Sequence, residues 1–180
     1  MLKRWKKLGT KVLFKNPWWT YRMDTFSIPD GITGQYHYVM TDGSSMIVPF
    51  TNEGKIILVN QYRYLCERES LEFPCGSIKQ GSSYLQTAQL ELAEETGYRA
   101  ETLEAVAEFN PYNGVSSEIC QVFFARNLHL TDVKADETEE FELHFCSPAE
   151  IDSMICTNQI RDGMSLAAWS LTRHLICKKM

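Results

Sequence analysis

The stretch that decides the fold is residues 76–98, which read GSIKQGSSYLQTAQLELAEETGY. Ser83 stands three residues before Gln86, the spacing of a capping box, and Gly97 stands where a helix commonly ends on a glycine. Three apolar residues recur between these signals on one helical stripe: Leu85, Ala88 and Leu92. The stretch therefore predicts a helix of about three to four turns that begins after Ser83.

Three glutamates occupy one face of this predicted helix. Glu91, Glu94 and Glu95 have i, i+3 and i+4 spacing, so their carboxylates are stacked and repel one another. The helix contains no Lys or Arg that could offset them. Hard divalent cations such as Mg²⁺ prefer oxygen ligands, so a metal ion is one source of the missing positive charge. A solvated acidic face is the alternative that the helix alone leaves open.

Segments of strand character lie on both sides of this helix. Before it, strand-like runs are separated by the turn signals Pro29-Asp30-Gly31 and Asn52-Glu53-Gly54. The expected strands cover residues 20–27, 35–40, 45–50, 55–60, 103–109, 119–124 and 141–145. Two further helices are expected, one over residues 148–156 and one from an N-cap at Asp162 through residue 175. Strands that bracket helices in this way predict an α+β fold.

Composition limits the class of protein. The 180 residues, 44% hydrophobic and 12% aromatic, can bury one sizeable core but are too few for two ordinary domains. The net charge of −5 argues against nucleic-acid binding, because proteins that track phosphates usually carry a basic surplus. The basic start of the chain lacks the continuous apolar run of a signal peptide, and no stretch approaches the roughly 18 apolar residues of a membrane span. We therefore expect a cytoplasmic protein that binds neither nucleic acid nor membrane.

The cysteines give no functional signal. They are widely spaced and include no C-x-x-C pair, which argues against a zinc site. We expect reduced and mostly buried thiols at all six positions: Cys66, Cys75, Cys120, Cys146, Cys156 and Cys177.

Residues 76–98 resemble the Nudix box, G-x5-E-x7-R-E-U-x-E-E-x-G-U, in which U is a bulky apolar residue. Both glycines and all three helix glutamates are in register with that pattern. The chain departs from it at Ser82, where the pattern has Glu, and at Leu90, where it has Arg. Tyr98 fits the last apolar position loosely. The resemblance implies a metal-dependent hydrolase of the Nudix superfamily.

Four segments outside the box extend this resemblance. Residues 61–64 and 71–76 are similar to the segments that lead into the box in ADP-ribose and nucleoside diphosphate sugar pyrophosphatases. Residues 111–118 resemble the proline loop of that group, and residues 136–140 resemble its acidic loop. In all, the resemblance covers about residues 18–169.

The resembled group has a characteristic architecture. It implies a Nudix-type α/β/α sandwich of mixed β-sheet with flanking helices, preceded by an antiparallel N-terminal sheet. Residues 1–180 would then be one domain, with N-terminal strands over about 1–44 and a catalytic core over about 45–180. In this group the N-terminal strands often pack across a two-fold dimer, so the resemblance also implies a homodimer.

The resemblance places a metal site on the predicted helix. Glu91 and Glu95 would bind Mg²⁺, for which Mn²⁺ can substitute. Glu94 would be a third ligand or a catalytic acid behind the ligands, and the backbone carbonyl of Cys75 would add an oxygen. Gly76 would let the backbone turn and present that carbonyl, although a plain turn glycine is the alternative.

Four residues are candidates for substrate binding. The guanidinium fork of Arg63 suits a pair of phosphate oxygens, although a surface ion pair is equally open. Glu72 lies in an otherwise apolar segment, where a carboxylate is costly to bury without a cation or a donor, so we expect it to act in the site through water. Trp19 is a candidate to stack on the base, although an aromatic core residue is the commoner role. Glu118 belongs to the proline loop.

The acidic loop is the expected source of the catalytic glutamate. In the resembled group such a loop closes over the metals, and one glutamate orients or deprotonates the attacking water. Glu137 and Glu139 align best with that residue, and Glu140 lies next to them. By composition alone, a run of acids is usually a solvated loop.

The implied reaction is in-line attack of water on one phosphorus of a nucleoside diphosphate sugar such as ADP-ribose, ADP-glucose or GDP-mannose. Metal ions would offset the charge that builds on the phosphate oxygens, and the products would be a nucleoside monophosphate and a sugar phosphate. Two alternatives stay open: a catalytically weak nucleotide-binding domain with the Nudix fold, and a Nudix enzyme that acts on another nucleoside polyphosphate.

Overall fold

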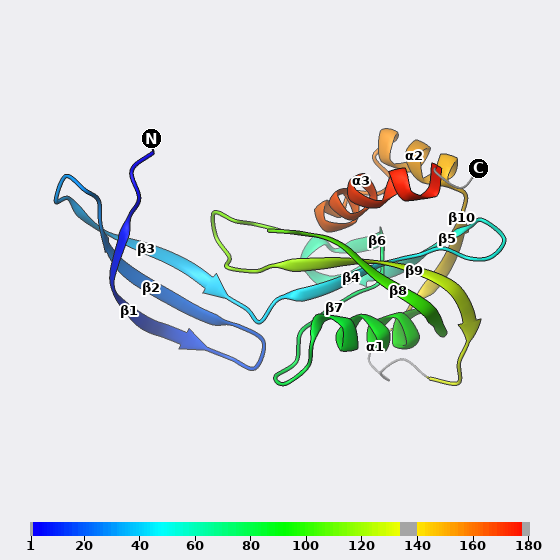
Figure 1. Ribbon diagram of the computed structural model, residues 1–180, viewed down its shortest axis with the longest axis horizontal. Helices are drawn as coiled ribbons and strands as arrows, with labels where there is room; N and C mark the ends of the chain where they lie inside the picture. Colours follow the sequence, from blue (N-terminus) through cyan, green and yellow to red (C-terminus); the bar gives the residue numbers. More distant parts are fainter. Residues whose placement is uncertain (1, 134–139, 178–180) are drawn as a thin grey trace. The chain divides into compact units, whose positions relative to one another are not determined.

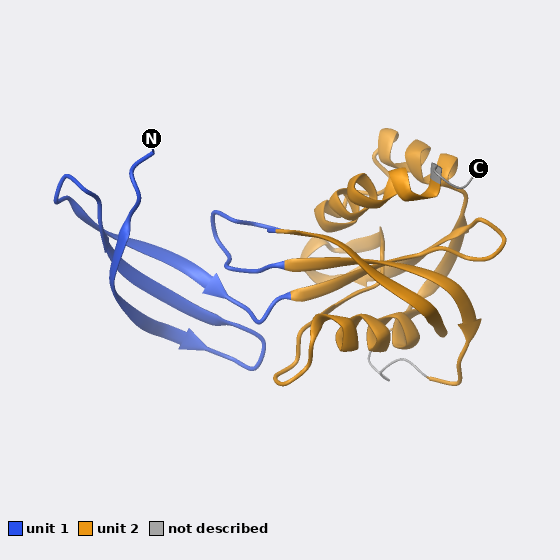
Figure 2. Cartoon of the chain, in the orientation of Figure 1, with its two compact units in different colours: residues 1–43, 110–119 blue, residues 44–109, 120–180 orange. Residues whose placement is uncertain are grey.

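The structure is a computed structural model that describes residues 2–133 and 140–177. The chain folds as two compact units, which Figure 2 colours separately. The first unit comprises residues 1–43 and 110–119, and the second comprises residues 44–109 and 120–180. The second unit contains the predicted helix with its three glutamates, and it therefore carries the candidate site.

The first unit is an antiparallel sheet with the strand order β1-β2-β3. Its strands are β1 (Lys6–Lys15), β2 (Thr20–Ser27) and β3 (Thr33–Met40). Segment 110–119 adds to the edge of β3, where Val39 N donates to Val115 O at 2.8 Å and Ser117 N donates to Val39 O at 3.0 Å. The expected N-terminal sheet is confirmed, but β1 was not predicted. The sequence of β1, KKLGTKVLFK, lacks the alternation of apolar and polar residues by which strands are recognised, and every residue of the strand is exposed.

Two sheets form the centre of the second unit. One has the order β7-β4-β9-β8, in which β4 and β9 are parallel and the other pairs are antiparallel, and the other is the antiparallel sheet β10-β5-β6. The strands are β4 (Ser44–Pro49), β5 (Ile56–Arg63), β6 (Arg68–Glu72), β7 (Cys75–Ser77), β8 (Tyr98–Phe109), β9 (Cys120–Leu130) and β10 (Glu142–Cys146). Because β6 and β7 are only five and three residues long, they offered no periodic pattern to predict.

Helices lie on both sides of these sheets, so the expected α+β sandwich is confirmed (Figure 1). α1 (Tyr84–Thr96) packs on one side, and α2 (Pro148–Cys156) and α3 (Gly163–Cys177) lie on the other. A short 3-10 helix, η1 (Tyr64–Cys66), joins β5 to β6. Among the described residues, no helix is both long and apolar enough to cross a membrane.

Local signals set the ends of α1 as the sequence predicted. Ser83 Oγ accepts from Gln86 N at 3.2 Å, and Ser83 N donates to Gln86 Oε1 at 2.9 Å, so the capping box is complete. Gly97 ends the helix with a φ of 71° and donates to Ala93 O at 2.9 Å. The apolar stripe was predicted less well, because Leu85 is 44% exposed.

The core lies on both faces of the four-stranded sheet. Under α1 it consists of Ala88 and Leu92 packed on residues of β4 and β9: Ile47, Phe123 and Ala125. The larger cluster joins the other face to α2 and α3 and includes Met46, Leu58, Phe73, Val122, Ile151 and Trp169. These two clusters hold α1 and α3 against the strands that carry the site.

The cysteines only partly follow the expectation. Cys120 and Cys146 are buried, Cys75 is half-buried, and Cys66 and Cys156 are exposed, all as free thiols. The prediction that most thiols are buried is therefore wrong for the five described here. Cys66 ends a 3-10 helix whose three residues are all exposed, and Cys156 is the exposed last residue of a short α-helix.

Candidate active site

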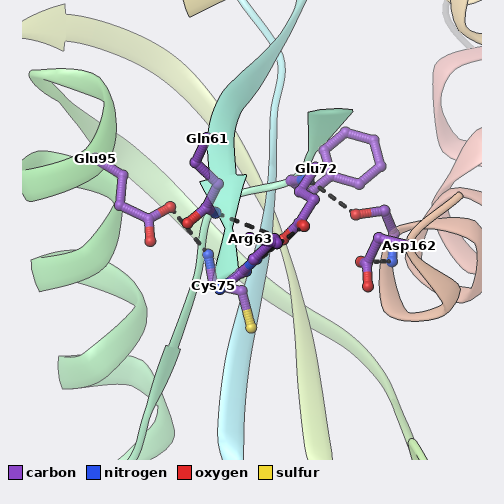
Figure 3. Close-up of polar contacts among 8 residues, drawn as sticks. Gln61, Arg63, Glu72, Cys75, Glu95 and Asp162 are labelled. Carbon is purple, nitrogen blue, oxygen red and sulfur yellow. Dashed lines mark hydrogen bonds and ion pairs between the residues drawn. The ribbon is translucent and has the colours of Figure 1, made fainter. Parts of the chain in front are cut away.

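The connection between β6 and β7, residues 72–76, is the centre of the candidate site (Figure 3). Glu72 ends β6 with only 4% of its surface exposed. Arg63 of β5 holds its carboxylate with a fork, since Nε donates to Oε1 at 2.9 Å and Nη2 donates to Oε2. Gln61 Nε2 makes a longer contact of 3.5 Å with Oε2. The donor that a buried carboxylate needs is therefore Arg63.

Arg63 is kept charged by the acids around it. Its hydrogen bond to Glu72 raises its pKa above the ordinary value, while partial burial acts in the opposite direction. The charges of Glu72, Asp162 and Glu95 add to the rise. The ion pair considered for Arg63 is thus present, and its partner is Glu72. Because 46% of the Arg63 side chain is exposed, the guanidinium can also meet a ligand, which stays a prediction.

Phe73 and Pro74 fix the connection to two other elements. Phe73 N donates to Ser165 Oγ of α3 at 3.0 Å, and Pro74 O accepts from Ile47 N of β4 at 2.9 Å. The Phe73 ring stacks on Trp169 at 6.2 Å between centroids. Since these residues are buried and bonded on both sides, the residues before and after them have little freedom to move.

Cys75 brings the connection to α1. Its backbone N–H donates to Glu95 Oε2 at 3.2 Å, and Glu95 is itself only 7% exposed. Figure 3 shows Glu95 on one side of the connection and Asp162 on the other. A hydrogen bond with Cys120 raises the pKa of the Cys75 thiol well above its ordinary value, and burial and the nearby Glu95 and Asp162 carboxylates add to the rise. The thiol is therefore protonated, so it is the backbone of Cys75 that is suited to the site.

Gly76 lies directly against Glu91. A Cβ atom at position 76 would fall 2.0 Å from both Cδ and Oε1 of Glu91, a distance that no side chain can keep. Gly76 is not among the residues with positive φ. The glycine is therefore required for space rather than for the turn that the sequence suggested, because its missing side chain lets the Glu91 carboxylate approach the strand.

The carboxylate and backbone oxygens gathered here suit a hard divalent cation. Glu91 and Glu95 stand one helical turn apart and meet adjacent residues of one strand, so two carboxylates and the backbone face a common region. Glu94 is partly buried beside them. Within residues 2–133 and 140–177, no three His, Cys, Asp or Glu side chains converge closely enough to enclose a metal ion. The described side chains thus bring two carboxylates, those of Glu91 and Glu95, to adjacent residues of β7, and their oxygens are of the kind that a hard cation prefers. Their role as metal ligands stays a prediction.

The remaining predicted site residues are placed elsewhere. Glu137 and Glu139 lie outside the described residues, and Glu140 is exposed two residues before β10. Trp19 and Glu118 belong to the first unit. Trp19 is 38% exposed, with its ring 5.5 Å from that of Phe14, and Glu118 N donates to Ser116 Oγ at 3.0 Å. The structure therefore brings together Arg63, Glu72, Cys75, Glu91 and Glu95, and roles for the others stay predictions.

Asp162 is the residue that the sequence did not connect with the site. It was predicted as a helix cap, and Ser165 N does donate to its Oδ2 at 2.7 Å. Its charge also raises the pKa values of Arg63 and Cys75, which places it near both. Asp162 lies almost 90 residues after Cys75, and no local pattern in the sequence could reveal that proximity.

Comparison with known proteins defines the class. Residues 40–165 match the family model of the NUDIX domain, well over half of the chain. The chain therefore belongs to the NUDIX domain family, and it is a Nudix hydrolase. Enzymes of this family generally use divalent metal ions.

Individual relatives show which members of the family the chain is similar to. The ADP-ribose pyrophosphatase of Bacillus subtilis (strain 168) is 34% identical over 118 residues, which are 66% of this chain and 64% of that protein. The methanol dehydrogenase activator of Bacillus methanolicus is 30% identical over 165 residues, 91% of this chain and 89% of that protein. A crystal structure of an ADP compounds hydrolase has the same fold, with a TM-score of 0.88 over 99% of this chain and 97% of that one at 21% identity. The expected resemblance to ADP-ribose pyrophosphatases is confirmed.

Proposed function

We propose that the chain hydrolyses the pyrophosphate bond of nucleoside diphosphate sugars of the ADP-ribose type, with Mg²⁺ as its metal and Mn²⁺ as a substitute. The products are a nucleoside monophosphate and a sugar phosphate. The observation that carries this proposal is the convergence of Glu91 and Glu95 on the adjacent residues Gly76 and Cys75. The likeness to an ADP-ribose pyrophosphatase supports the substrate class.

The site residues have distinct proposed roles. Glu91, Glu95 and the Cys75 carbonyl hold the cation, and Glu94 is a third ligand or an acid behind them. A bound divalent cation supplies positive charge to the phosphate oxygens as the bond breaks. Arg63, oriented by Glu72 through Nε and Nη2, donates from its remaining nitrogen to a phosphate oxygen. The chain thus meets the pyrophosphate from two sides.

A glutamate of the acidic loop is proposed to orient or deprotonate the attacking water. The candidates are Glu137, Glu139 and Glu140, each to be replaced separately by Gln. For the residue that acts on the water, kcat should fall far more than KM rises, because the group acts mainly in the transition state. Three variants with wild-type kinetics would remove this role from the loop.

The first unit is proposed to form a homodimer and to contribute Trp19 and Glu118 to substrate binding. Its apolar side chains support this, since many are exposed: Trp5, Leu8, Val12, Phe14 and Trp18 are each more than half exposed. Sedimentation velocity should give a dimer for the wild type and a shift toward monomer for Val12→Lys. A monomeric wild type would contradict the dimer. The expected cytoplasmic location also stays a prediction.

One experiment tests the activity. The protein is incubated with ADP-ribose, ADP-glucose, GDP-mannose and nucleoside triphosphates, each with Mg²⁺ or EDTA, and is then removed by ultrafiltration. Excess Mg²⁺ and Zn²⁺ are added to every sample so that alkaline phosphatase, which needs both metals, can release phosphate from any monoester formed. Release from the nucleotide sugars that requires Mg²⁺ is the expected result. Release from the triphosphates must be judged without the phosphatase, which attacks them directly. An absence of hydrolysis together with thermal stabilisation by nucleotide would indicate a binding domain.

A second candidate function is activation of a dehydrogenase. It is favoured by the likeness to the methanol dehydrogenase activator, which extends over 91% of this chain and so includes most of the first unit. The test adds wild-type protein or Glu95→Gln to a methanol dehydrogenase assay. If only the wild type activates the dehydrogenase, the activation depends on the hydrolase site. If both proteins activate it equally, the activation results from binding to the dehydrogenase and not from hydrolysis.

A further inference from the structure

A pocket of about 280 Å³ lies beside Glu91, between α1 and the loop that joins β7 to α1. Both elements belong to the second unit, and the loop is visible in Figure 1. The residues that line it are Ser77, Lys79, Ser82, Gln86, Thr87, Leu90 and Glu91. The volume is several times the roughly 30 Å³ that one water molecule occupies in the liquid, so the pocket has room for a monosaccharide ring.

The pocket is where this chain leaves the Nudix box pattern. Ser82 and Leu90 stand at the two positions that have Glu and Arg in the pattern, and both line this one space. A Glu and an Arg are larger than the Ser and Leu that line the pocket here, so they would occupy part of this space. The smaller Ser and the uncharged Leu leave it open. Two departures that are eight residues apart in sequence therefore have a single structural consequence.

The lining matches a neutral polyol. Lys79 and the hydroxyls of Ser77, Ser82 and Thr87 offer donors, and among the described residues none of these side-chain groups takes part in a hydrogen bond with another side chain or with the backbone. Glu91 offers an acceptor, and Leu90 provides an apolar wall for the C–H face of a ring.

We propose that this pocket is the subsite for the terminal sugar of the substrate. The inference rests on the proposed function, in which Glu91 helps to hold the cation at the pyrophosphate. The sugar is joined to the pyrophosphate by one ester oxygen, and Glu91 forms both a wall of the pocket and a part of the metal site. The pocket therefore lies where the sugar of a bound nucleotide sugar can enter it. Ser82 and Leu90 determine specificity by leaving that space open.

The decisive variant is Ser82→Glu combined with Leu90→Arg, which fills the pocket without a change in net charge. ADP-ribose is compared with ADP, which carries the same nucleoside diphosphate but lacks the terminal sugar. The KM for ADP-ribose is expected to rise at least about tenfold, while the Ki of ADP as a competitor changes less than about threefold. Lys79→Met, at an exposed position, is expected to raise the KM for ADP-ribose about threefold to tenfold with the same small change in the Ki of ADP.

Leu85→Arg is the matched control. Leu85 lies on the same helix with 44% of its surface exposed, against 41% for Leu90, but it does not line the pocket. It should keep the wild-type KM and Ki. If the double variant does not fold, Lys79→Met decides the question by itself.

Three results would overturn the subsite, and they are distinguishable. A wild-type protein that hydrolyses no nucleotide sugar would remove the proposed function and the subsite together. An active wild type whose KM is unchanged in the double variant and in Lys79→Met would remove the subsite alone. An equal rise in the KM for ADP-ribose and the Ki of ADP would show that the pocket affects the nucleotide or the metal, and not the sugar.

Discussion

The two sides of the site hold their carboxylates in different ways. On the β5–β6 side, Glu72 is paired with Arg63, a cation of the same chain. On the α1 side, Glu95 accepts from the backbone N–H of Cys75, and Glu91 lies against Gly76. An arginine cancels the charge of a carboxylate, whereas a backbone amide only solvates it. The difference favours the proposed division of roles, in which the pair on the β5–β6 side maintains the architecture and the α1 side binds an external cation.

The largest expected effect is that of Glu95→Gln. We expect kcat for ADP-ribose to fall at least about a hundredfold, because the change removes a metal-binding charge. Stability should change little, since the amide oxygen of Gln can still accept from Cys75 N–H. Steady-state kinetics at saturating Mg²⁺ and thermal melting test both parts. A variant with wild-type kcat would show that Glu95 does not bind the metal.

Gly76→Ala tests the close approach of Glu91. The added Cβ would fall 2.0 Å from the Glu91 carboxylate and displace it, so we expect kcat to fall at least about tenfold and the unfolding free energy to fall by about 1–3 kcal/mol. The measurements are steady-state kinetics and urea unfolding. Gly163→Ala is the matched control, because a Cβ there meets nothing within 4 Å. Wild-type behaviour of Gly76→Ala would show that the close approach of Glu91 to this strand is not needed for activity.

Arg63→Met tests the other side of the comparison. It leaves the buried Glu72 carboxylate without its partner, which should lower the unfolding free energy by about 1–3 kcal/mol. The double variant Arg63→Met/Glu72→Met removes both charges and should be more stable than the single variant. Urea unfolding of the wild type, Arg63→Met, Glu72→Met and the double variant gives the coupling between the two residues. Additive effects would contradict an architectural ion pair.

Mg²⁺ is expected to act through the α1 side alone. At about ten times its Kd, the ion should raise the Tm of the wild type by about 3–5 °C, because it binds the folded state and offsets the repulsion among the three glutamates. Glu95→Gln should lose most of this shift, and Arg63→Met should keep it. Differential scanning calorimetry with Mg²⁺ or EDTA measures the shift. Equal melting of the wild type in both conditions would mean that the acidic face is merely solvated.

The sequence could predict the features whose signals lie close together in the chain. α1 was predictable because its signals are local: Ser83, Gln86 and Gly97 act within the helix that they delimit. β1 was not, because a strand without a buried face has no period-two pattern. Charge and spacing identified Glu91 and Glu95 as a pair before any contact was known.

Contacts that depend on strand register or on distant elements were not predictable. Arg63 and Glu72 were named separately, but only the pairing of β5 with β6 makes them partners. The contact between Phe73 N and Ser165 Oγ spans 92 residues, and the approach of Asp162 to Arg63 is similarly remote. Such contacts form when the helices pack on the sheets, and the spacing of residues along the chain does not predict that packing.

The smallest expected effect concerns Leu90→Arg and the metal. From the sequence, an arginine at this position could reach Glu94 at i+4 and hold it, a pair worth only about 0.3–0.5 kcal/mol when exposed. The structure turns Leu90 toward the pocket that Ser82 and Glu91 also line, and Leu90 is 41% exposed. We expect Leu90→Arg to change the Mg²⁺ concentration for half-maximal activity by less than about tenfold, since tenfold corresponds to about 1.4 kcal/mol. A Mg²⁺ titration of the hydrolysis rate measures this. If Leu90→Arg instead activates an otherwise inactive protein, the natural chain is a nucleotide-binding domain and the proposed activity is wrong.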